Sequence, residues 1–199
     1  QKTAYEIPKR DWSSDVCSSD LHFANYFASF DAATLSAPVM ENAKACLLYG
    51  LAVGIGTRRA RPALLAQGAA DRKREAGAIT GFIDGIATSQ GSAAFANAVL
   101  LSGRVQGDSH PCGHIGGVII PSAIAAAEDA NASGASLLFA MVAGYESALR
   151  IGRDHCADLS LRGFRTTPAY GVFGAAVATG RLRGFDGTTM RHAIGLAAN

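Results

Sequence analysis

From His22 onward, apolar and small residues recur at spacings of three and four, which is the period of an α-helix. Phe23, Phe27 and Phe30 fall on one helical face, and a stripe of small and aliphatic residues runs through residues 137–152. Only residues 79–83 favour a short extended segment. The sequence therefore predicts an all-α fold, a multi-helix bundle.

Glycine, proline and small polar residues mark the ends of these helical stretches. They predict helices over residues 23–30, 36–54, 63–70, 89–105, 118–131, 136–155 and 170–182, and a last one from about 188. We expect the helix over 36–54 to be long and buried. We expect the helix over 89–105 to bury one face, made of Ala94, Asn97, Ala98, Leu101 and Val105. The small residues of 137–152 allow close contact, so that helix should lie at the centre of the bundle.

The chain of 199 residues has 49% hydrophobic and 17% charged residues, which is typical of a globular protein and not of a disordered one. Its formal net charge is +2, and its arginines are scattered, so we expect no nucleic-acid partner. The longest apolar runs fall well short of the roughly 20 residues of a membrane span, so we expect no membrane partner. Four cysteines without paired spacing favour a reducing, cytoplasmic location.

Residues 1–21 do not share the helical period of the rest. The segment from Asp11 to Leu21 resembles the conceptual translation of a common sequencing-library adapter, and the segment before it resembles the matching flow-cell end. We therefore interpret residues 1–21 as an assembly artefact, with a disordered leader as the alternative. Residues 22–199 then hold the folded domain.

Proton-handling side chains are concentrated in residues 107–117, between two expected helices. They are an acid, a hydroxyl, two imidazoles and a thiol: Asp108, Ser109, His110, Cys112 and His114. Pro111 and the glycines around it indicate a loop, and functional side chains concentrate in loops held by a rigid scaffold. This loop is the main candidate for a functional site.

Three interpretations of the loop are open. Imidazole and thiolate are suitable zinc ligands, so His110, Cys112 and His114 beside Asp108 could hold a metal ion. His110 and Cys112 could instead cap helices and pack in the core. We prefer acid–base catalysis, in which His114 moves a proton, Asp108 orients an imidazole and Ser109 binds substrate.

A second polar loop, residues 163–168, supplies Arg165. A planar guanidinium can bind a carboxylate through two parallel hydrogen bonds, and a surface ion pair is the alternative. If the protein is an enzyme, Asp108, His114 and Arg165 should line one cleft. A non-catalytic helical binding or interaction module would not require this.

Several segments together resemble the MmgE/PrpD family, which includes 2-methylcitrate dehydratase and cis-aconitate decarboxylase. The resemblance runs from about Phe23 to Asn199 and rests on motifs that occur in the family's order: Asn97-Ala98-Val99-Leu100, the Asp108 to Gly117 loop, Ile120-Pro121-Ser122-Ala123, Val142-Ala143-Gly144-Tyr145-Glu146 with Arg150-Ile151-Gly152-Arg153, Gly171-Val172-Phe173-Gly174-Ala175-Ala176 and His192-Ala193-Ile194-Gly195.

The resemblance implies a large helical domain, of which this chain is a part, followed by a smaller α/β lid. It implies a homodimer that acts on a small di- or tricarboxylate without a metal or other cofactor, as a dehydratase or decarboxylase, that is, a lyase. An isomerase or epimerase of the same family is an alternative. Family chains are more than twice as long, so the resemblance implies that this chain is a truncated fragment, inactive alone.

Residue by residue, the resemblance places His114 at an active-site histidine of the family and Asp108-Ser109 at its Asp-Thr pair. Together with the chemistry of the two loops, this predicts catalysis by His114 and Asp108, and substrate binding by Ser109, His110 and Arg165. Two positions depart from the family pattern. The leading aspartate of the family loop falls near Val105, and an active-site histidine of the second loop is replaced by Arg165. These departures indicate a divergent subgroup.

Overall fold

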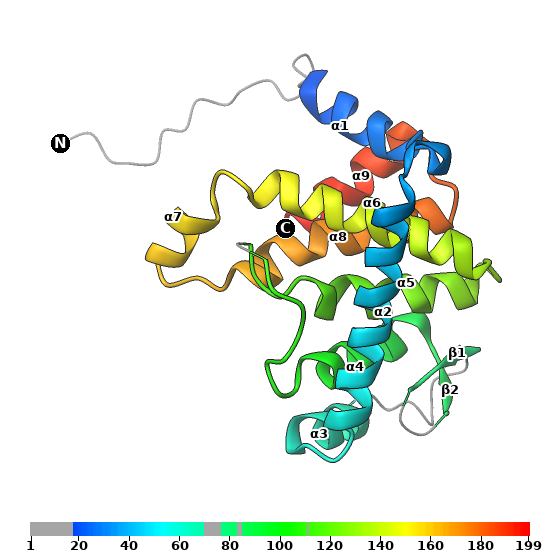
Figure 1. Ribbon diagram of the computed structural model, residues 1–199, viewed down its shortest axis with the longest axis vertical. Helices are drawn as coiled ribbons and strands as arrows, with labels where there is room; N and C mark the ends of the chain where they lie inside the picture. Colours follow the sequence, from blue (N-terminus) through cyan, green and yellow to red (C-terminus); the bar gives the residue numbers. More distant parts are fainter. Residues whose placement is uncertain (1–17, 70–76, 83–84, 111) are drawn as a thin grey trace.

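The computed structural model describes residues 18–69, 77–82, 85–110 and 112–199. Within these ranges the chain forms nine α-helices, one 3₁₀ helix and a two-stranded antiparallel sheet (Figure 1). In chain order they are α1 (Ser18–Ala28), η1 (Ala32–Thr34), α2 (Ala37–Thr57), α3 (Arg61–Ala69), β1 (Ile79–Thr80), β2 (Ala87–Thr88), α4 (Gln90–Ser102), α5 (Gly116–Asp129), α6 (Gly134–Gly152), α7 (Cys156–Leu161), α8 (Thr166–Leu182) and α9 (Gly187–Ala197). The predicted all-α bundle is confirmed.

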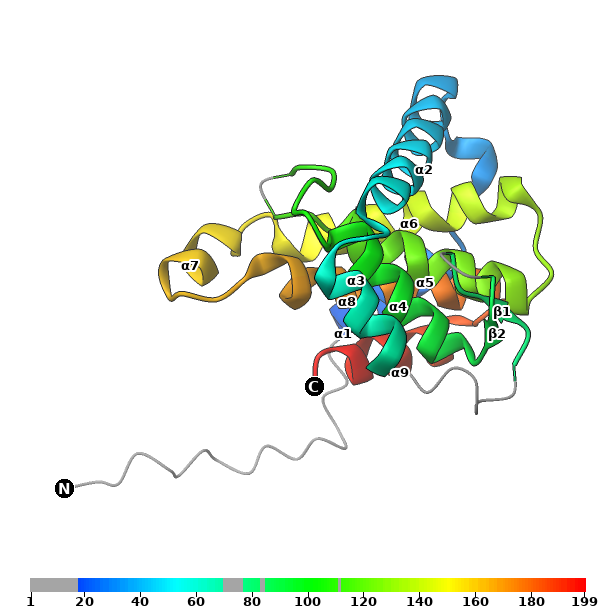
Figure 2. The same cartoon turned by 90° about the horizontal axis from the view of Figure 1, so that it is seen from below.

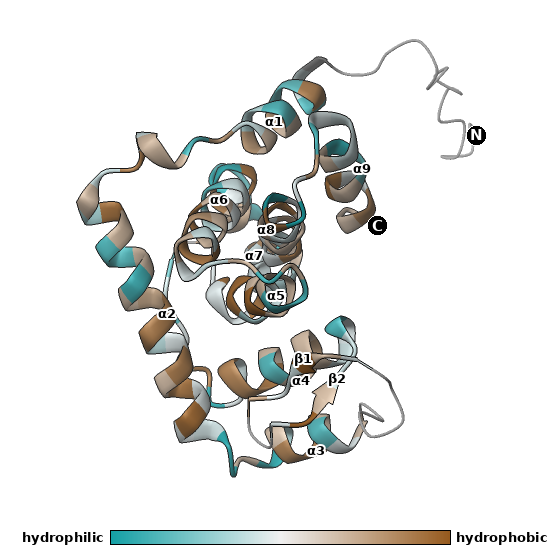
Figure 3. Cartoon of the chain, turned by 90° about the vertical axis from the view of Figure 1, so that its right-hand side faces the viewer, coloured by the Kyte–Doolittle hydropathy of each residue, from teal (hydrophilic) through white to brown (hydrophobic). Residues whose placement is uncertain are grey.

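Helices α5, α6 and α8 form the centre of the bundle, with α8 packed against both of the others (Figure 3). Small residues allow the closest contact. A Cβ on Gly144 of α6 would lie 2.7 Å from the carbonyl oxygen of Gly174 on α8. The side chain of Ile119 from α5 fills the space beside this crossing, because a Cβ on Gly174 would lie 2.5 Å from its Cδ1 atom. The predicted central position of the helix through residues 137–152 is therefore confirmed.

The remaining elements cover this centre on three sides. Helices α1 and α9 pack together at one end, around a cluster that includes Phe27, Val177 and Met190. Helices α3 and α4 and the short sheet lie at the opposite end, and α2 runs along the flank (Figure 3). Asn97, which is 3% exposed, fixes the strand end: its amide donates to Thr80 O and accepts from Phe82 N.

Capping residues set where several helices begin. Ser89, Ser133 and Asp186 each accept a main-chain N–H three residues further on, at the starts of α4, α6 and α9. These bonds satisfy donors that have no partner within the helix. The sequence predicted helix starts near residues 89, 136 and 188 from these capping residues. The structure confirms each start within two residues.

The expectation that the second helix is buried is wrong. Helix α2 is long, but only Ala43, Gly50, Gly54 and Thr57 are buried along it, and Leu48 and Ile55 are 70% and 65% exposed. Its sequence is largely apolar, so composition suggests burial, whereas the buried residues of α2 lie on the face that packs against α4, α5 and α6 among the described residues.

Two other details also differ from expectation. Helix α4 ends at Ser102, so Val105 lies beyond it and is 65% exposed, and the buried face includes Ala93 and Leu100 in place of Ala94 and Ala98. The buried face of α4 differs from the expected one because α4 packs against α5 as well as against α2 and α3. The six-residue helix α7 falls in a segment for which no helix was expected.

Of the residues interpreted as an artefact or leader, 1–17 lie outside the described residues, and 18–21 form the first turn of α1 although their sequence shows no helical period. In the part of the chain that the structure describes, no helix combines the length and the apolar character needed to cross a membrane.

Candidate functional site

The loop between α4 and α5 is closed by a tight turn. The main chains of His110 and Gly113 exchange two hydrogen bonds, of 3.2 and 2.7 Å, and His110 Nδ1 accepts the N–H of Cys112. Gly113 has φ +100°, and a Cβ there would lie 2.5 Å from Thr167 Oγ1. Only glycine fits this position, because it must adopt a positive φ and lie against the second loop.

Two hydrogen bonds fix His114, which follows this turn. Its main-chain N–H donates to Thr167 Oγ1 at 2.9 Å, and its Nδ1 lies 2.6 Å from the carbonyl oxygen of Asp108. A carbonyl oxygen only accepts hydrogen bonds, so we assign the proton of the neutral ring to Nδ1. The basic lone pair of His114 is then on Nε2.

The Asp108 carboxylate binds the start of α5. Asp108 Oδ1 accepts the N–H of Gly116 at 3.1 Å, where the partial positive charge of a helix N-terminus favours an anion. The hydroxyl of Tyr145 on α6 lies against the same glycine and carboxylate. Burial, and then the negative charge of Asp108, hold the pKa of Tyr145 well above its ordinary value. Asp108 thus holds His114 through its carbonyl group and α5 through its side chain.

His114 and Arg165 line the same small cleft, of about 80 Å³. Arg165 is exposed and immediately precedes the first residue of α8. Its neighbour Thr167 and the loop residue Val105 line the cleft as well. The structure therefore brings together one basic imidazole and one guanidinium from loops about fifty residues apart in sequence.

Asp108 lies in an adjacent hollow of about 10 Å³, which shares Leu101, Gly107 and Gly117 with the cleft. The side chains of Ser109 and His110 are exposed, and neither residue lines the cleft. Of the five predicted site residues, His114 and Arg165 line one cleft, and Ser109 and His110 lie exposed outside it. Asp108, which we expected in the same cleft, lines the adjacent hollow instead, because its carboxylate binds the start of α5.

The arrangement around the loop does not gather metal ligands. Among the described residues, no three His, Cys, Asp or Glu side chains are placed to hold one ion. Cys112 is fully buried beside Cys156 and Tyr170, which is the packing role that the second interpretation gave it.

Sequence reasoning missed Thr167. Its hydroxyl accepts the His114 N–H and lines the cleft, so it joins the two loops. The sequence feature that could have pointed to Thr167 is a hydroxyl side chain two positions after Arg165, in the first turn of a helix. That signal is weak, since such residues are common at helix starts for capping alone.

Comparisons with known proteins identify the family to which the fold belongs. A family profile described as the MmgE/PrpD N-terminal domain matches residues 21–199. The chain is 28% identical to a cis-aconitate decarboxylase of Aspergillus terreus over 206 residues, which cover 99% of the chain and 40% of that protein. It is also 28% identical, over 205 residues, to the cis-aconitate decarboxylase-like protein oryM of Aspergillus oryzae, with 96% of the chain and 40% of that protein covered. The chain thus spans about two fifths of the length of these relatives.

Proposed function

The chain belongs to the MmgE/PrpD family, and on that premise we propose that it carries part of the active site of a lyase. The lyase removes water or carbon dioxide from a small di- or tricarboxylate by acid–base catalysis. The names of the curated relatives support the decarboxylase or dehydratase type. The observation that carries the proposal is the pairing of His114 and Arg165 in one cleft.

In this proposal, Nε2 of His114 moves the proton. In a dehydration, the neutral ring takes a proton from the carbon beside a carboxylate while hydroxide leaves from the neighbouring carbon. The imidazolium so formed gives that proton to the hydroxide, so that water leaves and the ring is neutral again. In a decarboxylation, carbon dioxide leaves and the protonated ring gives its proton to the resulting carbanion. Both reactions need a group that can take up and release a proton near neutral pH, and the imidazole of histidine is the side chain suited to this.

Arg165 binds a substrate carboxylate in this scheme. Its guanidinium stays charged at all relevant pH values and offers paired N–H donors to the two carboxylate oxygens. A bound carboxylate next to the reacting carbon gains negative charge as the carbanion forms, so the same contact stabilises the transition state. The replacement of a family histidine by Arg165 would then alter which carboxylate is accepted.

Asp108 acts as a positioning residue in the proposal, because its carbonyl oxygen holds the Nδ1–H of His114 and leaves Nε2 free. Ser109 and His110 remain proposed substrate contacts on the outer side of the loop. Homodimer assembly and independence from a metal ion follow, as further parts of the proposal, from the family resemblance. A cytoplasmic location is proposed from the four cysteines without paired spacing.

The cleft is too small to hold a whole substrate, so we do not expect this chain to be active by itself. Ligand sites are usually of roughly 300–1,000 Å³, whereas this cleft has about 80 Å³. We therefore assign to this chain one wall of the substrate pocket, and the reaction to the full-length protein. The chain alone should show no turnover.

The experiment measures turnover by the full-length protein on a panel of small di- and tricarboxylates that includes cis-aconitate, with and without a chelator. Carbon dioxide release and the change in alkene absorbance report the two lyase reactions. His114→Gln should lower kcat by roughly 10²- to 10⁴-fold, and Arg165→Lys should mainly raise KM. His192→Gln, an exposed histidine on α9, is the matched control and should leave both unchanged.

Retained turnover in His114→Gln, with helicity unchanged by circular dichroism, would contradict the proposal. A product with the same formula as its substrate would instead indicate an isomerase or epimerase. Carboxylate binding without any turnover by the full-length protein would favour the binding module.

A further inference from the structure

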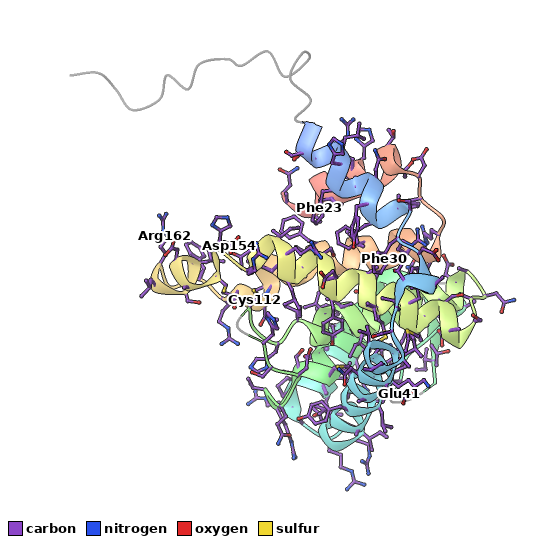
Figure 4. The ribbon with its side chains drawn as sticks, turned by 45° about the horizontal axis from the view of Figure 1, so that its top comes forward. Phe23, Phe30, Glu41, Cys112, Asp154 and Arg162 are labelled. Carbon is purple, nitrogen blue, oxygen red and sulfur yellow. The ribbon has the colours of Figure 1, made fainter. Side chains whose placement is uncertain are left out.

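Two cysteines that the proposed function does not use lie together in one buried cluster: Cys112 belongs to the loop that carries His114, and Cys156 begins α7. Cys112 is fully buried, Cys156 is 8% exposed, and both belong to one buried cluster with Tyr170. Figure 4 places Cys112 at the base of the projecting segment that carries Asp154 and Arg162. The two thiols come from segments 44 residues apart (156 − 112) and meet through the tertiary fold.

Gly152, the last residue of α6, makes this contact possible. A Cβ at Gly152 would lie 2.8 Å from Cys112 Sγ and 3.0 Å from the Tyr170 ring. The sulfur of Cys112 therefore lies directly on the main chain at the end of α6, four residues before Cys156. A side chain at position 152 would displace the Cys112 sulfur from this position.

The two thiols differ in how an external reagent could reach them. Burial raises the pKa of Cys112 to about 11, with smaller contributions from a hydrogen bond to Cys156 and from its charge. Reactive cysteines are partly exposed thiolates, so Cys112 is a poor site of first attack. Cys156 is the first residue of α7, a helix of six residues that projects from the bundle (Figure 2).

Helix α7 has the features of a segment that opens locally. It is short, it packs only lightly against α8, and its Leu161 is 87% exposed. Helices of this length are marginal without tertiary packing, and local opening draws on such low-stability segments. Opening of α7 would expose Cys156 while the buried Cys112 stays in place next to it.

We propose that Cys112 and Cys156 form a reversible disulfide when the protein meets a low-molecular-weight disulfide such as oxidised glutathione. The Cys156 thiolate attacks the external disulfide, forms a mixed disulfide and releases one thiolate. The Cys112 thiolate then attacks Cys156 Sγ, forms the internal bond and releases the second thiolate. The two cysteine protons pass to the two released thiolates, so the external disulfide is reduced and the cysteine pair is oxidised.

The bond would join the His114 loop to the start of α7. Cys112 lies inside the turn that His110 and Gly113 close, two residues before His114. Oxidation would therefore restrain the loop at one wall of the cleft. The formation of the bond does not depend on the proposed lyase function.

The experiment treats the folded protein with oxidised glutathione, blocks free thiols, and analyses a non-reducing tryptic digest by mass spectrometry. Trypsin cuts at Arg104, Arg150, Arg153 and Arg162, so the two cysteines fall in separate peptides, 105–150 and 154–162. We expect these peptides to appear joined, lighter than their sum by two hydrogen atoms, and to separate after reduction with dithiothreitol.

Variants assign the order of the steps. Cys112→Ala should leave glutathione bound to Cys156, because the second thiol is missing. Cys156→Ser should leave Cys112 as a free thiol. Cys46→Ser is the matched control, since Cys46 lies on α2 outside this cluster, and the linked peptides should still form. Circular dichroism verifies that each variant keeps its helicity.

The proposal fails if glutathione modifies Cys46 alone while Cys112 and Cys156 stay reduced. It also fails if the linked peptides form only after the protein is unfolded, or if Cys46 pairs with either thiol as readily as they pair with each other.

Discussion

The hydroxyl of Thr167 accepts the main-chain N–H of His114 at 2.9 Å, and this bond ties the loop before α5 to the first turn of α8. His114 and Arg165 come from these two segments, so their common cleft depends on the contact. Gly113 lies against the same threonine, since a Cβ there would approach Thr167 Oγ1 to 2.5 Å. The position of the imidazole is thus set by a residue fifty-three positions away.

Thr167→Val should loosen the His114 loop without changing the shape of the cleft wall. The substitution removes the acceptor and leaves a partly buried N–H without its partner, which costs about 1 kcal/mol. Hydrogen exchange measured by mass spectrometry should show faster exchange in the peptide that contains His114. Thr188→Val, at an exposed threonine of α9, should leave that exchange unchanged. Equal exchange in both variants would show that the bond does not hold the loop.

Val105→Asn should stabilise the protein. Val105 has φ +55°, a left-handed conformation that strains a β-branched residue, whereas Asn131 has φ +49° and is of a type that tolerates it. Since the Val105 side chain is 65% exposed, its loss removes little packing, and the gain should be about 1 kcal/mol. Urea unfolding measures it. Val105→Ile keeps the branched Cβ and should give no gain; a matching gain there would refute the strain argument.

Gly144→Ala should destabilise the central crossing of α6 and α8. The new methyl group would lie 2.7 Å from Gly174 O, so the helices must separate, which costs about 1–3 kcal/mol. Gly195→Ala is the matched control, because that helical glycine of α9 has nothing within 4 Å of a new Cβ. It should raise the free energy of unfolding by about 0.5–1 kcal/mol. Stabilisation by both substitutions would mean that helix propensity, and not the close approach, decides stability at position 144.

Asp186 should contribute stability that is lost in acid. Hydrogen bonds from Thr189, first from its main chain, hold the pKa of Asp186 below its ordinary value. The unfolded chain takes up this proton near pH 3.9, before the folded chain does. The contribution is therefore complete above the ordinary pKa and is lost as the pH falls through the lower folded value.

Thermal unfolding measured across a pH series tests the pH dependence of the stability that Asp186 contributes. Asp186→Ala should lower Tm by a few degrees at neutral pH, and the gap to the unmodified protein should narrow below about pH 4. Ser133→Ala removes an uncharged cap, in which Ser133 Oγ accepts the N–H of Ser136, and its effect should not change with pH. A gap at Asp186 that stays constant down to pH 2 would exclude the charge contribution.

Local sequence patterns were sufficient to predict where several of the helices lie. The spacing of Phe23, Phe27 and Phe30 predicted a helix, and α1 contains the first two of them, whereas Phe30 lies two residues beyond its end. The cap at Asp186 predicted the start of α9. These features depend on residues within one or two turns of each other. The sequence could not predict which residues of α2 are buried, because apolar residues occur both on its buried face and on the face that is exposed among the described residues.

For the candidate site too, some features follow from the sequence alone and others only from the tertiary structure. The sequence by itself determined that Asp108, His114 and Arg165 lie in polar loops between helices, since glycine, proline and the side-chain types of those segments decide it. Only the tertiary structure decided that Asp108 holds His114 through its carbonyl oxygen, that Thr167 joins the two loops, and that Cys112 meets Cys156. Those contacts depend on how α5, α6 and α8 cross, and the crossing is set by side-chain packing between residues far apart in the chain.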